Sequence, residues 1–139
     1  MTGGGGGHGP GGPRAPGPGS GGLTLREAQE AVDAWISRFE EGYWPPLANL
    51  ARLTEEVGEL ARELNHRYGA KPKKPGEPDV DLGLEMADVL FVLLALANEQ
   101  GIDLEDALER VLEKYEVRDA GRWTPRKGGP GDGGTTPRT

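Results

Sequence analysis

Cysteine is absent from the 139 residues of this chain. Its absence excludes disulfide bonds, zinc–thiolate sites and thiol nucleophiles, and it agrees with a reducing, cytoplasmic location, which we expect. Long apolar runs are also missing: the longest is the nine-residue stretch Val89–Ala97, whereas a membrane span needs roughly 20 residues. No apolar run follows the initiator methionine, so the sequence predicts neither a secretory signal nor a membrane partner.

Positive charge is scarce in the part of the chain that can fold. Residues 23–124, which we expect to form one domain, hold 22 Asp or Glu against 12 Lys or Arg. We therefore expect no nucleic-acid partner, because phosphate backbones are bound by clustered Lys and Arg. Residues 1–22 contain twelve of the 24 glycines and almost no apolar side chains, and residues 125–139 are similar. Both segments are predicted to be disordered tails.

Apolar residues recur at helical spacing in four segments, and no strand pattern stands out. Thr24, with Glu27 three residues later, is typical of a helix N-terminus. We expect helices over Leu23–Phe39, Leu47–His66 and Leu82–Gln100, and a fourth helix that begins after Asp103. The prediction is an all-α domain in which the second and third helices form an antiparallel hairpin.

The second predicted helix has two different stripes. Its buried stripe is expected to consist of Leu53, Val57, Leu60 and Leu64. A polar stripe roughly 90° away borders the core, and it consists of Arg52, Glu56, Glu59 and Glu63. Taken alone, that stripe is better explained as a solvated charged face in which Arg52 pairs with Glu56. The third helix is apolar on all sides, which predicts that it is buried, in part against a second subunit.

Two pairs of carboxylates stand three residues apart on these helices. Side chains at that spacing are neighbours on one helical face, and the pairs are Glu56 with Glu59 and Glu85 with Asp88. If the two helices face each other, the four carboxylates surround one space, and carboxylate oxygens are ligands that Mg²⁺ prefers. Acids in an exposed first helical turn can also simply complement the helix dipole. The sequence thus favours a metal site that handles phosphates.

Four further residues are candidates for substrate binding, each with an alternative. Trp44, next to Tyr43 in a predicted loop, either closes the end of the core or covers a bound base. Asn98 is either a hydrogen-bonding residue of the core, which we slightly favour, or a substrate contact. Lys114 and Arg118 either complement a helix C-terminus or grip a polyphosphate.

Three segments together resemble a known family: ARLTEEVGELAREL at 51–64, EMADVLFVLLALAN at 85–98 and KYEVRDAGRW at 114–123. They resemble the MazG-like nucleotide pyrophosphohydrolases of the all-α NTP pyrophosphatase superfamily, in particular its short single-domain bacterial members. The chain departs from the common pattern at Ala87, where the family often has glycine, and at Leu84, where it often has glutamate. Neither departure removes a carboxylate.

The resemblance implies a four-to-five-helix bundle whose central hairpin holds the acidic site and which a homodimer or homotetramer completes. It implies a Mg²⁺-dependent enzyme, with Mn²⁺ as a possible substitute, that cleaves (d)NTPs to (d)NMPs and pyrophosphate. A role in cleaning the nucleotide pool would follow. Alternatives are a phosphoribosyl-ATP pyrophosphohydrolase and, from another class, a non-catalytic helical interaction protein.

The resemblance also assigns roles to individual residues. Metal ligands would be Glu56, Glu59, Glu85 and Asp88. Glu55, together with Glu56, would be catalytic, because the family's additional acid at this position binds a further ion or orients the attacking water. Lys114 and Arg118 match a Lys-x-x-x-Arg pair that contacts phosphates.

Overall fold

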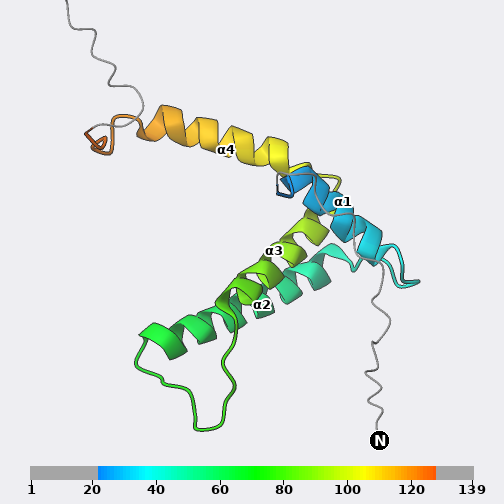
Figure 1. Ribbon diagram of the computed structural model, residues 1–139. Coiled ribbons are helices and arrows are strands. Elements are labelled where there is room, and N and C mark those ends of the chain that lie inside the picture. The colour runs from blue at the N-terminus through cyan, green and yellow to red at the C-terminus, as the bar shows by residue number, and fades with distance from the viewer. Residues whose placement is uncertain (1–21, 128–139) are drawn as a thin grey trace, which may run out of the picture. The chain divides into compact units, whose positions relative to one another are not determined.

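The computed structural model describes residues 22–127, which contain four helices and no strand (Figure 1). The helices are α1 (Leu25–Ile36), α2 (Pro46–Tyr68), α3 (Leu82–Glu99) and α4 (Leu104–Asp119). The predicted all-α fold is confirmed, and each predicted helix is found with ends shifted by a few residues. The two predicted tails lie almost entirely outside the described residues.

Side chains at the helix starts explain where α1 and α3 begin. Thr24 Oγ1 accepts a hydrogen bond from the Glu27 backbone amide at 3.1 Å, and its hydroxyl donates to the Glu27 carboxylate at 3.0 Å. The predicted cap is therefore present, although Glu27 bonds the hydroxyl of Thr24 and not its backbone amide. Asp81 caps α3 in the same way, accepting from the amides of Gly83 and Leu84.

Helices α2 and α3 lie side by side and antiparallel, joined by the loop over residues 69–81 (Figure 1). Helix α3 also packs against α1. The buried apolar cluster between α1 and α3 consists of Val32, Leu94 and Ala95, with partly buried side chains around it. Because this core is small, polar contacts contribute to holding the three helices together.

A partly buried amide pair, Gln29 and Asn98, fixes the C-terminal end of α3 to α1. Gln29 donates to Asn98 Oδ1 at 3.0 Å and to the Ile102 carbonyl at 2.8 Å. Asn98 returns a hydrogen bond to the Gln29 carbonyl at 2.9 Å, and Gln29 Oε1 accepts from the Leu104 amide at 2.9 Å. Buried polar groups are tolerated when they are paired in this way. The pair therefore orients the segment that leads from α3 into α4.

The predicted burial of α2 is found only in part in the single chain, where Leu53 and Leu60 are half-buried. Val57 and Leu64, expected in the core, are 46% and 37% exposed, whereas Glu56 and Glu63 are only 4% and 5% exposed. Helix α2 thus lies against the rest of the domain with part of its acidic stripe, Glu56 and Glu63, as well as with part of its apolar stripe. Cationic side chains compensate the buried carboxylates, which would otherwise oppose this orientation.

Helix α3 is buried mainly over its C-terminal half in the single chain, and burial of the rest against a second subunit remains a prediction. Val92, Leu94, Ala95 and Ala97 are buried, but Met86, Leu90 and Leu93 are exposed. Exposed apolar surface of this kind is common at contacts between proteins. The apolar composition of α3 is therefore not explained by its contacts within one chain.

The described residues divide into two units, one ending at Glu105 and the other beginning at Asp106. Most of α4 belongs to the second unit, and α4 contains no buried residue. Among the described residues, no helix combines the length and the apolar character that crossing a membrane requires.

Candidate metal centre

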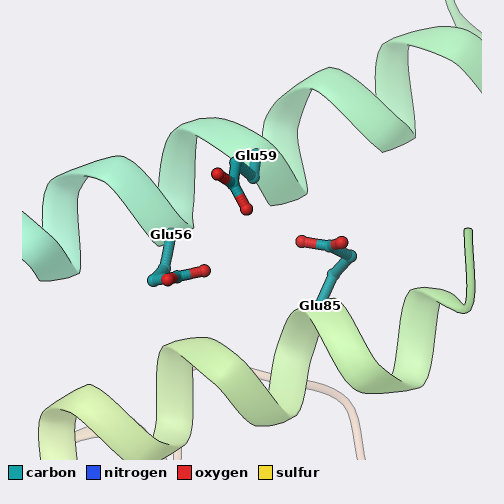
Figure 2. Close-up of side chains that lie close together, drawn as sticks. All are labelled: Glu56, Glu59 and Glu85. Carbon is teal, nitrogen blue, oxygen red and sulfur yellow. The ribbon is translucent and has the colours of Figure 1, made fainter.

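Three carboxylates converge between α2 and α3. Glu56, Glu59 and Glu85 each offer one carboxylate oxygen, and these three oxygens lie within 4.8 Å of one another. Figure 2 shows the side chains pointing toward one another from the two helices. Glu56 and Glu59 share a face of α2 because they are three residues apart, and Glu85 lies in the first turn of α3. The hairpin therefore brings together members of both predicted carboxylate pairs.

The charge and burial of this three-carboxylate cluster favour the binding of a cation. Glu85 Oε2 is buried and has no hydrogen-bond partner. Burial, followed by the repulsion of Glu59, Asp88 and Glu56, raises the pKa of Glu85 above its ordinary value. A buried acceptor without a partner is costly, and so are like charges held close together. A divalent cation between the three carboxylates would remove both costs, and oxygen ligands of this kind suit Mg²⁺ or Mn²⁺.

Asp88 and Glu55 are placed differently from the cluster. Asp88 is exposed and does not join the three oxygens, although its charge contributes to the raised pKa of Glu85. An unpaired carboxylate next to three others is better solvated by water, which explains why it is exposed. Glu55 is exposed on α2, beside Glu56. Their roles as metal ligand and as catalytic acid remain predictions.

Glu63 continues the acidic stripe of α2 but is neutralised by its own cations. Its carboxylate lies 3.0 Å from Arg67 Nε and 3.3 Å from Lys73 Nζ. The hydrogen bond from Arg67, with Lys73 adding to it, lowers the pKa of Glu63 below its ordinary value. Lys73 belongs to the loop over residues 69–81, so this ion pair also fastens that loop to α2. Among the described residues, only Arg52 offers comparable neutralisation to the cluster of Glu56, Glu59 and Glu85.

Arg52 connects the cluster to a second feature, an aromatic pocket of about 390 Å³. Its Nε lies 2.7 Å from Glu56 Oε1, and the same side chain lines the pocket. We call this space the aromatic pocket because its lining includes Trp35, Phe39, Tyr43, Trp44 and Phe91. Trp35 meets Phe39 and Phe91 edge to face, with ring centroids 5.0 and 5.7 Å apart. Its volume lies within the range of small-molecule sites.

The predicted substrate residues of the first unit have different surroundings. Trp44 lines the aromatic pocket, where a planar ligand could contact it. Asn98 uses both ends of its amide in hydrogen bonds with Gln29, which agrees with the core role that the sequence slightly favoured. Binding of substrate by either residue remains a prediction.

Lys114 and Arg118 lie on α4, in the second unit. Lys114 Nζ is 5.2 Å and Arg118 Cζ is 4.9 Å from the ring centroid of Tyr115, so the two cations flank one aromatic side chain. Arg118 also forms a two-pronged ion pair with Asp119, which raises its pKa further. Their contact with phosphates remains a prediction.

Asn49 is a pocket residue that the sequence did not single out. It is 5% exposed, lines the aromatic pocket and donates a hydrogen bond to the Trp44 carbonyl at 3.2 Å. One signal could have identified it: Asn49 stands seven residues before Glu56 and therefore on the same face of the helix. An amide at that place predicts a polar contact where an apolar residue would be expected.

Known proteins resemble this chain over most of its length. The protein YpjD of Bacillus subtilis is 55% identical over 106 residues, which is 76% of this chain and 96% of YpjD. YvdC of the same organism is 31% identical over 97 residues, covering 63% of this chain and 92% of YvdC.

Two solved structures also resemble this chain. The crystal structure of YpjD from B. subtilis has a TM-score of 0.63 and covers 68% of this chain and 97% of that one. The crystal structure of a MazG protein conserved in Bacillus, described as a nucleotide pyrophosphohydrolase, has a TM-score of 0.61 and is 47% identical. It covers 72% of this chain and 97% of its own. The model of the MazG nucleotide pyrophosphohydrolase domain matches residues 45–123, a segment that includes all three carboxylates of the cluster, and the chain therefore belongs to this family of hydrolases.

Proposed function

We propose that the protein is a Mg²⁺-dependent enzyme that cleaves nucleoside or deoxynucleoside triphosphates to monophosphates and pyrophosphate, and that it removes unwanted nucleotides from the pool. The observation that supports this most directly is the buried, unpartnered Glu85 Oε2 within a cluster of three carboxylates. Such a cluster repels a free triphosphate. It attracts one that arrives with divalent cations.

The distance along α2 between the aromatic pocket and the carboxylate cluster suits the length of a nucleotide. Asn49 in the aromatic pocket and Glu56 in the cluster are seven residues apart, which corresponds to about 10 Å along the helix axis. That separation is comparable to the distance between the base and the phosphates of an extended nucleotide. A base between the rings of the pocket, with Trp44 as one wall, would thus place its phosphates near the carboxylates.

Each group of the site has a distinct task in this proposal. Glu56, Glu59 and Glu85, together with Asp88, would hold a divalent cation, which would neutralise charge and make a bound water more acidic. Glu55 orients the attacking water, and Arg52 holds the Glu56 carboxylate in place through their hydrogen bond. Lys114 and Arg118 stabilise the pyrophosphate that leaves. Positioning and electrostatics are most of what phosphoryl chemistry requires of a protein.

A panel of nucleotides tests the proposal. Purified protein with Mg²⁺ is expected to release pyrophosphate and the matching monophosphate from at least one NTP or dNTP, whereas chelation of the metal stops the reaction. Product analysis by ion-exchange chromatography distinguishes this from release of inorganic phosphate. Turnover of phosphoribosyl-ATP alone would instead identify the related histidine-pathway activity, and no turnover of any nucleotide would favour a binding protein.

We also propose that the active form is a homo-oligomer, a dimer or a tetramer. The exposed apolar side chains of α2 and α3, among them Val57, Leu64 and Leu90, support this because they form surface that a second copy could cover. Light scattering at micromolar concentration is expected to give a mass of two or four chains. A mass of one chain in the active preparation would contradict the proposal.

A further inference from the structure

The wall of the aromatic pocket contains a hydrogen-bond acceptor without a partner. Asn49 directs its Nδ2 to the Trp44 carbonyl, at 3.2 Å, which leaves Oδ1 as the other end of a fixed amide. Within residues 22–127 this oxygen accepts no hydrogen bond. The buried side-chain atoms without a partner there are His66 Nδ1 and Glu85 Oε2, so Asn49 Oδ1 is at least partly accessible. Since only 5% of Asn49 is exposed and the residue lines the pocket, Oδ1 has access to the pocket.

A second acceptor lines the same space. Glu41 belongs to the pocket lining, and its carboxylate forms no ion pair in the described part of the chain. Two other polar side chains of the lining, Tyr43 and Arg52, each bind a neighbouring carboxylate. Tyr43 donates to Asp33 at 2.6 Å, and burial together with this bond raises the pKa of Tyr43 to about 12. Arg52 donates to Glu56. Asn49 Oδ1 and the exposed Glu41 carboxylate thus remain available to accept hydrogen bonds from a ligand.

We propose that Asn49 and Glu41 select nucleobases that have an exocyclic amino group. The proposal rests on the pyrophosphohydrolase activity proposed above and names the class of base that the enzyme prefers. An amino group has two N–H bonds, so it can donate to Asn49 Oδ1 and to the Glu41 carboxylate together. A carbonyl oxygen in its place would face two acceptors, and none of the three groups would form a hydrogen bond. Sites built for hydrogen bonds discriminate strongly against ligands that leave their polar groups unpaired.

The aromatic walls cannot make this distinction themselves. Stacking on Trp35, Phe91 and Trp44 depends on the flat face of a base, which cytosine and uracil share almost completely. The two bases differ at the ring position that bears an amino group in cytosine and a carbonyl in uracil. They therefore form a matched pair of ligands that reports the polar contacts alone.

The test compares the binding of dCMP and dUMP to the full-length protein without metal, by isothermal calorimetry. We expect dCMP to bind at least ~10-fold more tightly, because its amino group gains hydrogen bonds that a carbonyl held against the same acceptors would lose. Equal binding, or tighter binding of dUMP, would overturn the proposal. Because this binding measurement needs no turnover, it is independent of the nucleotide panel. Hydrolysis without a base preference would contradict only this inference. A base preference without hydrolysis would contradict only the proposed activity.

Two variants locate the preference. Asn49→Leu is expected to weaken dCMP binding about tenfold and to leave dUMP binding within twofold, while the matched control Asn65→Leu, an exposed asparagine of the same helix, changes neither. Glu41→Leu, at an exposed position, is expected to reduce the same ratio even if Asn49→Leu does not fold. An unchanged ratio in a folded Asn49→Leu protein, or in Glu41→Leu, would overturn the assignment of that residue.

Discussion

Glu59→Gln is expected to reduce hydrolysis more than ~100-fold, because a catalytic metal contributes several kcal/mol of stabilisation to the transition state. Glutamine keeps the shape of the side chain but removes the negative charge that Glu59 contributes to the cluster. Steady-state pyrophosphate release under saturating Mg²⁺ measures the loss. Raising Mg²⁺ further is expected to restore only part of the activity.

The fold should survive this substitution. Glu59 is exposed and its carboxylate faces two others, so its neutralisation relieves repulsion. Without metal, the melting temperature of Glu59→Gln should therefore lie within about 4 °C of the wild-type value, as for other surface changes in a small domain. Glu30→Gln removes the same charge from an exposed position on α1 and should keep full activity. Activity of a folded Glu59→Gln protein near the wild-type level would show that the carboxylates do not hold the catalytic metal.

The helices and three of the carboxylates could be predicted from the sequence because both depend on short-range spacing. Apolar periodicity identified α1 to α4, and the pairs at 56 and 59 and at 85 and 88 fixed which carboxylates share a helical face. A loop between two antiparallel helices then brings the pairs together. Asp88 shows the limit of this reasoning, since spacing places a residue on a face but does not set its side-chain orientation.

The orientation of α2 could not be predicted, because helical periodicity assumes that apolar residues face the core of the same chain. Here Glu56 and Glu63 are buried, and Val57 is exposed. The ion pairs that permit this, Arg52 with Glu56 and Lys73 with Glu63, include a contact from the loop that follows the helix. Whether a stripe of α2 is covered by α3 or by another molecule depends on tertiary partners that the local pattern does not contain.

Asn49 and the aromatic pocket were missed for a related reason. The pocket combines α1, the loop that follows it, α2 and α3, so its members are far apart in the sequence. Trp44 could be suspected as a loop aromatic, but Phe91 is hidden within an apolar run where every residue has the same appearance. Some side chains of that apolar run line the pocket and others are exposed. Only the packed structure shows which are which.

Glu85→Gln is expected to have two opposite effects on stability. In the absence of metal the variant should melt a few degrees above the wild type. The raised pKa of Glu85 means that its ionised form is disfavoured in the folded state, so at neutral pH, above the ordinary pKa of the group, the charge destabilises the fold. The neutral amide removes that penalty and can also donate to the neighbouring carboxylates.

With Mg²⁺ the order should reverse. A cation at 100 times its dissociation constant stabilises the wild type by about 2.7 kcal/mol, which for a domain of this size raises the melting temperature on the order of 10 °C. The variant should lose most of this rise, whereas Glu30→Gln should keep it. Scanning calorimetry with NaCl at matched ionic strength separates binding from general screening. A full response of Glu85→Gln to Mg²⁺ would contradict the placement of a cation between α2 and α3, because Glu85 would then not be a ligand. A variant that melts below the wild type without metal would also contradict it, because the Glu85 carboxylate would then already be satisfied by the protein alone.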